Sequence, residues 1–157
     1  MMTARGPQVL EFNARFGDPE TQAILMRLES PLVDALEACI DGRLAETTLS
    51  WTPGASACVI ASSAGYPGSY KTGFPISGLD PAARIPGVRV FHSGTALLGD
   101  QIVTAGGRVL GVTAAAASLE EALARVYLAM EEIQFQGMHY RRDIGHRALK
   151  DVYKRQL

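Results

Sequence analysis

The sequence predicts an α+β fold, in which two N-terminal helices precede a small antiparallel β lobe with one long helix. Pro19 and Pro31 each follow a residue that favours a helix start, and apolar residues recur behind Pro31 at helical spacing. Further along, short apolar segments alternate with glycine and proline turns, which is typical of antiparallel strands. Ser118 and Glu121 form a capping box before a long amphipathic segment. This segment is the helix expected to pack on the sheet.

Length and composition limit the kinds of protein that the chain can be. Its 157 residues, 47% of them apolar, are enough for one packed domain, or for a small domain plus part of another. The net charge of −1 gives no overall attraction to nucleic acid or to an anionic membrane. The longest apolar stretch, residues 109–117, is far too short to span a bilayer. We therefore expect neither a nucleic-acid nor a membrane partner.

The two cysteines indicate the compartment. Cys39 and Cys58 have no CxxC spacing and no third metal ligand nearby. Isolated cysteines of this kind are usually buried thiols in a reducing compartment, rather than a disulfide or a zinc site. The expected location is the cytoplasm.

The helix boundaries follow from capping signals. Asp18 is a good N-cap residue with Pro19 at the first helical position, and this helix is expected to run to about Arg27. A second helix is expected to start after Ser30-Pro31 and to close at Gly42. Its predicted apolar stripe consists of Leu32, Val33, Leu36, Cys39 and Ile40.

The β lobe is expected to begin after Pro53-Gly54, where the composition changes from polar and irregular to apolar. Gly65-Tyr66-Pro67-Gly68 is expected to form a tight loop, and Gly106-Gly107 a hairpin turn. The predicted strands are residues 57–64, 76–79, 88–96, 101–104 and 108–113.

Residues 9–13 are the best candidate for a strand that carries chemistry. A turn at residues 5–7 would lead into this strand, in which Leu10 and Phe12 share one face and Glu11 and Asn13 the other. A carboxylate and an amide oxygen about 7 Å apart on one strand suit a hard cation such as magnesium, and Arg15 has the same parity. The same pattern is also typical of a solvated strand face, so spacing alone leaves both interpretations open.

Five sequence blocks in order resemble glycinamide ribonucleotide synthetase (phosphoribosylamine–glycine ligase), a family of ATP-grasp ligases. They extend over most of the chain, and we refer to them below as the five family blocks. The blocks are residues 10–22 (with Gly17-Asp18-Pro19-Glu20), Gly65-Tyr66-Pro67-Gly68-Ser69-Tyr70, Val90-Phe91-His92-Ser93-Gly94-Thr95, Gly106-Gly107-Arg108-Val109-Leu110 and Arg142-Asp143-Ile144-Gly145-His146-Arg147-Ala148.

The resemblance implies an enzyme of de novo purine synthesis. Such an enzyme activates glycine as an acyl phosphate with ATP and Mg²⁺ or Mn²⁺, and then joins it to 5-phosphoribosylamine. Residues of this sequence that match the family take the implied roles: metal ligands Glu11 and Asn13, catalytic residues Arg15 and Asp18, and substrate-binding residues Asp18, Glu20, Arg142 and Arg147. From the residues alone, Asp18 is explained almost as well by a helix cap, and the arginine pair by a charged terminus.

The resemblance also implies the organisation of the chain. Residues 1–50 would be the C-terminal end of an ATP-grasp domain, residues 55–149 a C-terminal antiparallel lobe, and residues 150–157 a non-native tail. An N-terminal part of the same enzyme would precede Met1, and without it the chain is expected to be inactive. Two alternatives stay open: another ATP-grasp ligase or carboxylase of purine synthesis, and a noncatalytic binding or assembly module.

Overall fold

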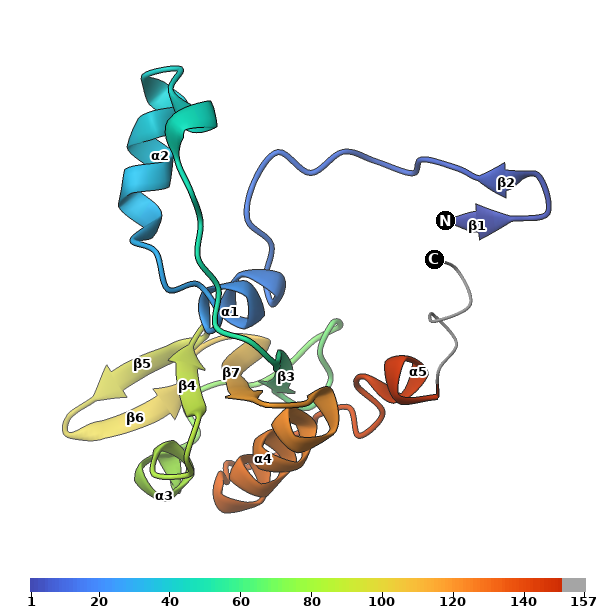
Figure 1. Cartoon of the computed structure of the whole chain (residues 1–157). Coiled ribbons are helices and arrows are strands. Elements are labelled where there is room, and N and C mark those ends of the chain that lie inside the picture. The colour runs from blue at the N-terminus through green and yellow to red at the C-terminus, as the bar shows by residue number, and fades with distance from the viewer. Residues whose placement is uncertain (151–157) are drawn as a thin grey trace.

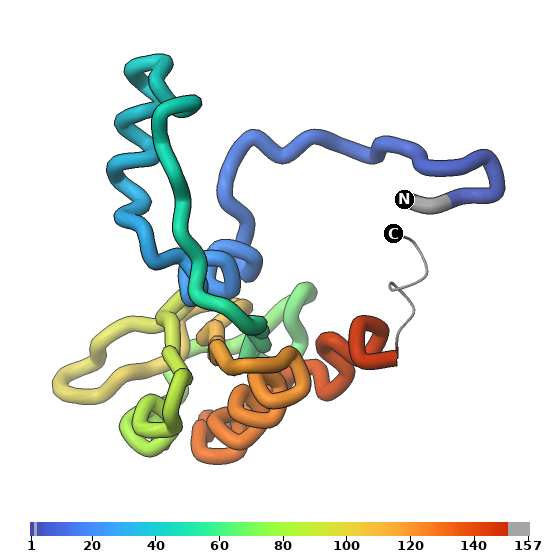
Figure 2. The backbone as a smooth tube through the Cα atoms, in the orientation of Figure 1, coloured from blue at the N-terminus to red at the C-terminus, as the bar shows by residue number. Residues whose placement is uncertain are grey.

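The computed structural model of the chain describes residues 1–150 (Figures 1 and 2). A three-stranded antiparallel sheet lies at its centre, in the order β3 (Ala55–Ser62), β7 (Arg108–Ala116), β4 (Val88–His92). The central strand β7 pairs with β3 and β4, one on each edge, and is buried along most of its length. Mixed helices and antiparallel strands are therefore confirmed. Except for Lys150, the predicted non-native tail lies outside the described residues.

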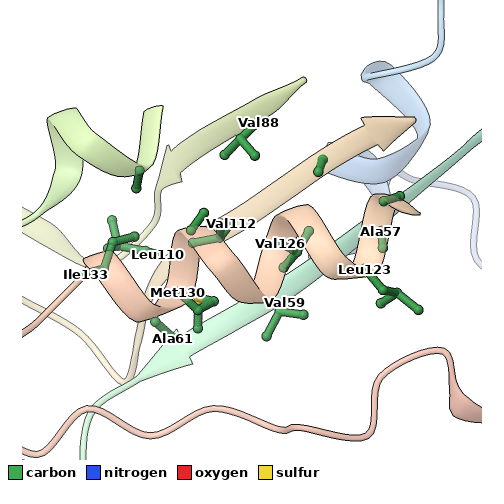
Figure 3. Packing of buried hydrophobic residues seen from close by; sticks show 14 of the residues in the cluster. Ala57, Val59, Ala61, Val88, Leu110, Val112, Leu123, Val126, Met130 and Ile133 are labelled. Carbon is green, nitrogen blue, oxygen red and sulfur yellow. The ribbon is translucent and has the colours of Figure 1, made fainter. Parts of the chain in front are cut away.

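The long helix α4 (Leu119–Glu132) packs on β3 and β7, as the sequence predicts. Leu123, Val126 and Met130 point from one face of the helix towards the sheet (Figure 3). The Ser118 hydroxyl accepts a hydrogen bond from the backbone N–H of Glu121 at 3.1 Å, which confirms the N-cap. The Glu121 carboxylate instead accepts a bond from Arg125 one turn on, at 3.1 Å. The apolar face of α4 is thus buried against β3 and β7.

The predicted strand over residues 88–96 is interrupted in the structure. β4 ends at His92, and β5 (Thr95–Leu98) pairs with β6 (Gln101–Thr104) in a separate two-stranded sheet. The interruption falls at Gly94, where the backbone packs on that of Gly106; a side chain at Gly94 would lie 2.7 Å from the Gly106 Cα. Gly106-Gly107 consequently joins two sheets. The prediction of a hairpin turn there was wrong, because the turn of the β5-β6 hairpin lies at residues 99–100.

Residues 76–79 do not form the predicted strand. Pro75 and Ser77 make isolated bridges, and helix α3 (Leu79–Ala83) begins at this point. Gly78 adopts a φ of +79°, and a Cβ at this position would lie 2.6 Å from the backbone carbon of Glu132. The close approach to α4 and the left-handed turn therefore require glycine and redirect the chain into a helix.

Helix α1 (Glu20–Leu25) and helix α2 (Leu32–Ile40) confirm both predicted helices, and the 3-10 helix η1 (Leu44–Glu46) follows them. α2 stands away from the sheet (Figure 1). Its predicted apolar stripe is exposed except for the half-buried Leu32, with Ile40 84% accessible, whereas the buried residues of the helix are Ala35 and Ala38. Cys39 is also exposed, which corrects the expectation of two buried thiols, while Cys58 is buried as predicted.

The N-terminal segment is extended away from the sheet. β1 (Met2–Thr3) and β2 (Gly6–Pro7) form a short hairpin that turns at residues 4–5. Residues 9–13, expected to be a strand, pair with no other strand among residues 1–150, and Phe12 is 89% accessible. A strand is defined by its backbone partner, so alternation of side chains alone does not produce one. None of the described helices is long and apolar enough to cross a membrane.

We expect Met130→Ala to lower the free energy of unfolding by about 2–5 kcal/mol, because it leaves a cavity under α4. Met130 is 1% accessible and packs in the core. Leu128 lies on the same helix and is 51% accessible, so Leu128→Ala is a matched control that should change the value by no more than about 0.5 kcal/mol. Urea titration of both variants measures the difference. Equal losses would contradict the packing described for α4.

Candidate functional site

Three segments far apart in the sequence meet at Arg108, the first residue of β7. Arg108 Nη1 donates a hydrogen bond of 2.6 Å to the backbone carbonyl of Asp18 and lies 3.5 Å from the Asp18 Oδ2. Arg108 Nε donates a bond of 3.0 Å to the hydroxyl of Tyr66. Asp18 precedes α1, and Tyr66 lies in the turn after β3. One side chain thus links three of the five family blocks, and we call these three residues the Arg108 cluster.

Asp18 faces this cluster instead of capping α1. Its Oδ1 accepts a hydrogen bond of 2.7 Å from Gln22 Nε2, and no side-chain cap is formed at the start of α1. The first turn is closed by the carbonyl of Gly17, which accepts from the backbone N–H of Thr21 at 3.0 Å. The N-cap prediction for Asp18 was therefore wrong. With 46% of its side chain accessible, Asp18 keeps part of its carboxylate open to a ligand.

The surroundings of Arg108 favour its charged form. The hydrogen bond to Tyr66 is the largest cause that raises the pKa of the Arg108 guanidinium, and the charge of nearby Asp18 adds to it. Because the side chains are 40% and 46% accessible, solvent screens this ion pair. The ion pair therefore contributes little free energy, and its main effect is to fix the positions of the side chains. Gly107 permits the arrangement, since a side chain there would lie 3.0 Å from the Tyr70 ring and closer still to that of Tyr66.

Arg15 and Glu20 lie on either side of Gly17. A Cβ added at Gly17 would lie 2.9 Å from Glu20 Cδ and 3.2 Å from Arg15 Nη1. Arg15 also donates a hydrogen bond of 3.3 Å to the carbonyl of Phe16. One cation and one carboxylate thus lie close to a single glycine, while the Asp18 carboxylate is directed towards Gln22 and Arg108. Such a group can bind an amine through the carboxylates and a phosphate through the arginine.

Glu11 and Asn13 lie on the same side of the extended segment. Asn13 Nδ2 donates a hydrogen bond of 3.2 Å to Glu11 Oε1, so the alternation predicted from the sequence holds for these two side chains. A carboxylate with a neutral amide fits two ligand positions of a hard cation. Residues 1–150 contain no group of three or more His, Cys, Asp or Glu side chains that could hold a metal. A cation here would therefore take further ligands from water or substrate.

Arg142 and Arg147 have different surroundings. The Arg142 guanidinium carbon lies 5.0 Å from the centre of the Tyr140 ring, and Arg147 is exposed on α5 (His146–Leu149). Asp143 pairs with neither of them. It accepts two hydrogen bonds from Arg141, of 2.9 and 2.8 Å, and this pairing lowers the pKa of the Asp143 carboxyl.

A cleft of about 270 Å³ brings the first and last family blocks together. Its lining includes Glu20 from α1 and Ile144 and Gly145 from the C-terminal segment. Gly145 has a φ of +77°, and a Cβ there would lie 2.6 Å from Leu123 Cδ1, so this glycine is needed for packing. Cys58 also lines the cleft, and burial raises the pKa of its thiol. The lining is mostly apolar, which does not suit a phosphate.

The sheet, the long helix and the docked polar loop define an α+β domain with a preceding helical segment. A family model described as "Phosphoribosylglycinamide synthetase, C domain" matches residues 56–147, which hold α4 and all of the three-stranded sheet except Ala55. The chain belongs to this phosphoribosylglycinamide synthetase family.

Individual relatives agree with the family model. The chain is 53% identical over 144 residues to a phosphoribosylamine–glycine ligase of Chlorobaculum tepidum, covering 91% of this chain and 34% of the relative. It is 47% identical over 150 residues to the phosphoribosylamine–glycine ligase of Rhodopirellula baltica, covering 95% of this chain and 34% of the relative. The crystal structure of phosphoribosylamine–glycine ligase from Thermotoga maritima superposes with a TM-score of 0.76 at 30% identity, covering 91% of this chain and 34% of that one. The chain spans about a third of the length of these relatives.

Arg108, Tyr66 and Gln22 were not singled out from the sequence, although the structure joins them to Asp18. Arg108 and Asp18 are 90 positions apart, and no local spacing rule connects residues at that distance. A usable signal was present in the sequence. Arg108 directly follows Gly106-Gly107, and paired glycines often mark a close approach of other groups to the backbone.

Proposed function

We propose that the chain is the C-terminal part of a phosphoribosylamine–glycine ligase. The reaction joins glycine to 5-phosphoribosylamine with ATP, and yields glycinamide ribonucleotide, ADP and phosphate. The family model over residues 56–147 and the curated relatives support this proposal. The observation that carries it is the contact of Arg108 with Asp18, because it docks the polar Gly17-Asp18-Pro19-Glu20 loop on the matched C domain.

In this proposal residues 1–50 are the end of an ATP-grasp domain and residues 55–149 the C-terminal lobe. The start of the family match at residue 56 supports the boundary. The exposed apolar stripe of α2 and the unpaired residues 9–13 support a further part of the same enzyme as their partner. A cytoplasmic location stays a prediction.

Glu11 and Asn13 would hold Mg²⁺ or Mn²⁺, since their side chains are neighbours and carry a carboxylate and an amide oxygen. When bound, the ion would supply positive charge to the phosphates of ATP. Arg15 would neutralise charge on the transferring phosphoryl group. Asp18 and Glu20 would bind an amine or a ribose hydroxyl; the partly accessible Asp18 carboxylate and the position of Glu20 beside Gly17 support this.

A direct test of the proposed function is ADP release by the complete enzyme that contains this chain. We expect release to require both glycine and phosphoribosylamine, and the 157-residue chain alone to release none, because it spans about a third of its relatives. A coupled assay that omits each substrate in turn measures this. ADP release that does not depend on glycine would indicate another ATP-grasp ligase. No ADP release by the complete protein would indicate a noncatalytic module.

In the complete enzyme, Glu11→Ala should reduce turnover by at least about 100-fold, since removing a metal ligand costs more than disturbing a residue behind one. Asp18→Asn should cost less. Asparagine can still accept the hydrogen bond from Gln22, and the backbone bond from Arg108 does not depend on the side chain. Turnover measured over a range of magnesium concentrations tests this. A larger loss at Asp18 than at Glu11 would refute the metal assignment.

We extend the proposal to Arg142 and Arg147 as ligands of the sugar phosphate. Each bond to a charged group contributes about 1.5–3 kcal/mol, so Arg142→Ala and Arg147→Ala should each raise the KM for phosphoribosylamine by about 10- to 150-fold. Arg141→Ala is the matched control, because its guanidinium already pairs with Asp143. Steady-state kinetics with ATP and glycine saturating decide the matter. An unchanged KM in both variants would remove these arginines from the site.

A further inference from the structure

We propose that Arg108 is a positioning residue, which holds the Gly17-Asp18-Pro19-Glu20 loop in one geometry on the C domain. This role was not among those implied by the family resemblance. The structural half of the proposal depends only on the contacts of Arg108. The kinetic half rests on the proposed function, because the loop carries the carboxylates expected to bind substrate.

The first step is the bond to the backbone. Arg108 Nη1 lies 2.6 Å from the carbonyl oxygen of Asp18, whereas the Asp18 Oδ2 is 3.5 Å away. The shorter bond goes to the main chain, so it fixes the path of the loop and not only one side chain. A charged donor makes this bond stronger than a neutral one.

The second step is the orientation of the guanidinium. Tyr66 accepts from Arg108 Nε at 3.0 Å, on the other side of the fork from Nη1. The Tyr66 ring lies against Gly107, where any side chain would collide with it, and its centre is 6.3 Å from that of Tyr70. Two bonds at different nitrogens define the guanidinium plane. A lysine has a single ammonium group and cannot reproduce that arrangement.

The third step is that the loop makes no other hydrogen bonds to the lobe within the described residues. Among residues 1–150, no other hydrogen bond joins residues 9–20 to the β lobe. The next one, from Ser56 Oγ to the carbonyl of Ala23, lies further along α1, which buries none of its residues. Without Arg108 the loop would keep its internal bonds and its continuity with α1, which contacts β3 and β7, but residues 9–20 would lose the hydrogen bonds that join them directly to the lobe. Arg15 and Glu20 would shift with it, since both lie beside Gly17.

Hydrogen exchange in the 157-residue chain tests the structural half. Thr21 N–H, which bonds to Gly17, reports on the loop, and Val112 N–H in β7 reports on the core. In Arg108→Lys and Tyr66→Phe we expect Thr21 to exchange at least about fivefold faster, with Val112 unchanged. Arg89→Ala is the control, because Arg89 is exposed on β4 and makes no ion pair within the described part of the chain. Unchanged exchange at Thr21 in both variants would overturn the proposal.

Kinetics of the complete enzyme test the other half. Arg108→Lys should lower kcat/KM for glycine by at least about tenfold, the loss expected from a misplaced binding group, with the melting temperature unchanged. Arg108→Ala should lower kcat/KM for glycine as well, and millimolar guanidinium, which can make the same hydrogen bonds, should restore part of it. A variant that lost activity because it unfolds would not recover in this way. Wild-type values for both Arg108 variants would end the positioning role. No glycine-dependent ADP release by the wild-type enzyme would instead refute the proposed function, while the exchange result would still stand.

Discussion

The burial of β7 between β3 and β4, with α4 across one face, is the constraint on which the rest of the structure depends. Val112 pairs with Val59 on one edge and with Val90 on the other, and is fully buried. Consecutive residues of β7 are buried, so both of its faces are covered. A shift of register would break the pairing on both edges and displace side chains packed on both faces. Arg108 is the first residue of this strand. The candidate site is therefore attached to the most constrained element of the domain.

Several glycines of the family blocks are explained by close packing and not by chemistry. Gly94 and Gly106 let two backbones touch, Gly107 makes room for Tyr66, and Gly145 makes room for Leu123. At each of these positions a side chain would collide with a neighbour, so packing alone explains the glycine. Three polar members of the blocks, Arg108, Tyr66 and Asp18, meet where the loop before α1 contacts the sheet. The resemblance implied a site without distinguishing its supporting residues from those expected to bind substrate.

The N-terminal third of the chain differs physically from the lobe. The lobe buries its apolar side chains, whereas Phe12 and the stripe on α2 stay exposed. Exposed apolar side chains on an amphipathic helix are expected where another part of a protein covers them. This segment makes few hydrogen bonds to the lobe, so the Arg108 cluster is important for the order of the loop before α1.

The sequence by itself determined most of the secondary structure and the parity of Glu11 and Asn13. Capping signals and helical or alternating periodicity act over a few residues, so α2, α4, β3 and β6 could be predicted from them. It did not determine the break at Gly94, the helix after Gly78 or the exposure of Cys39. Those features depend on which segments meet, and only the tertiary structure decided that. The same holds for Arg108: its partner Asp18 lies 90 positions away, and only the folding of β7 against the loop brings the two together.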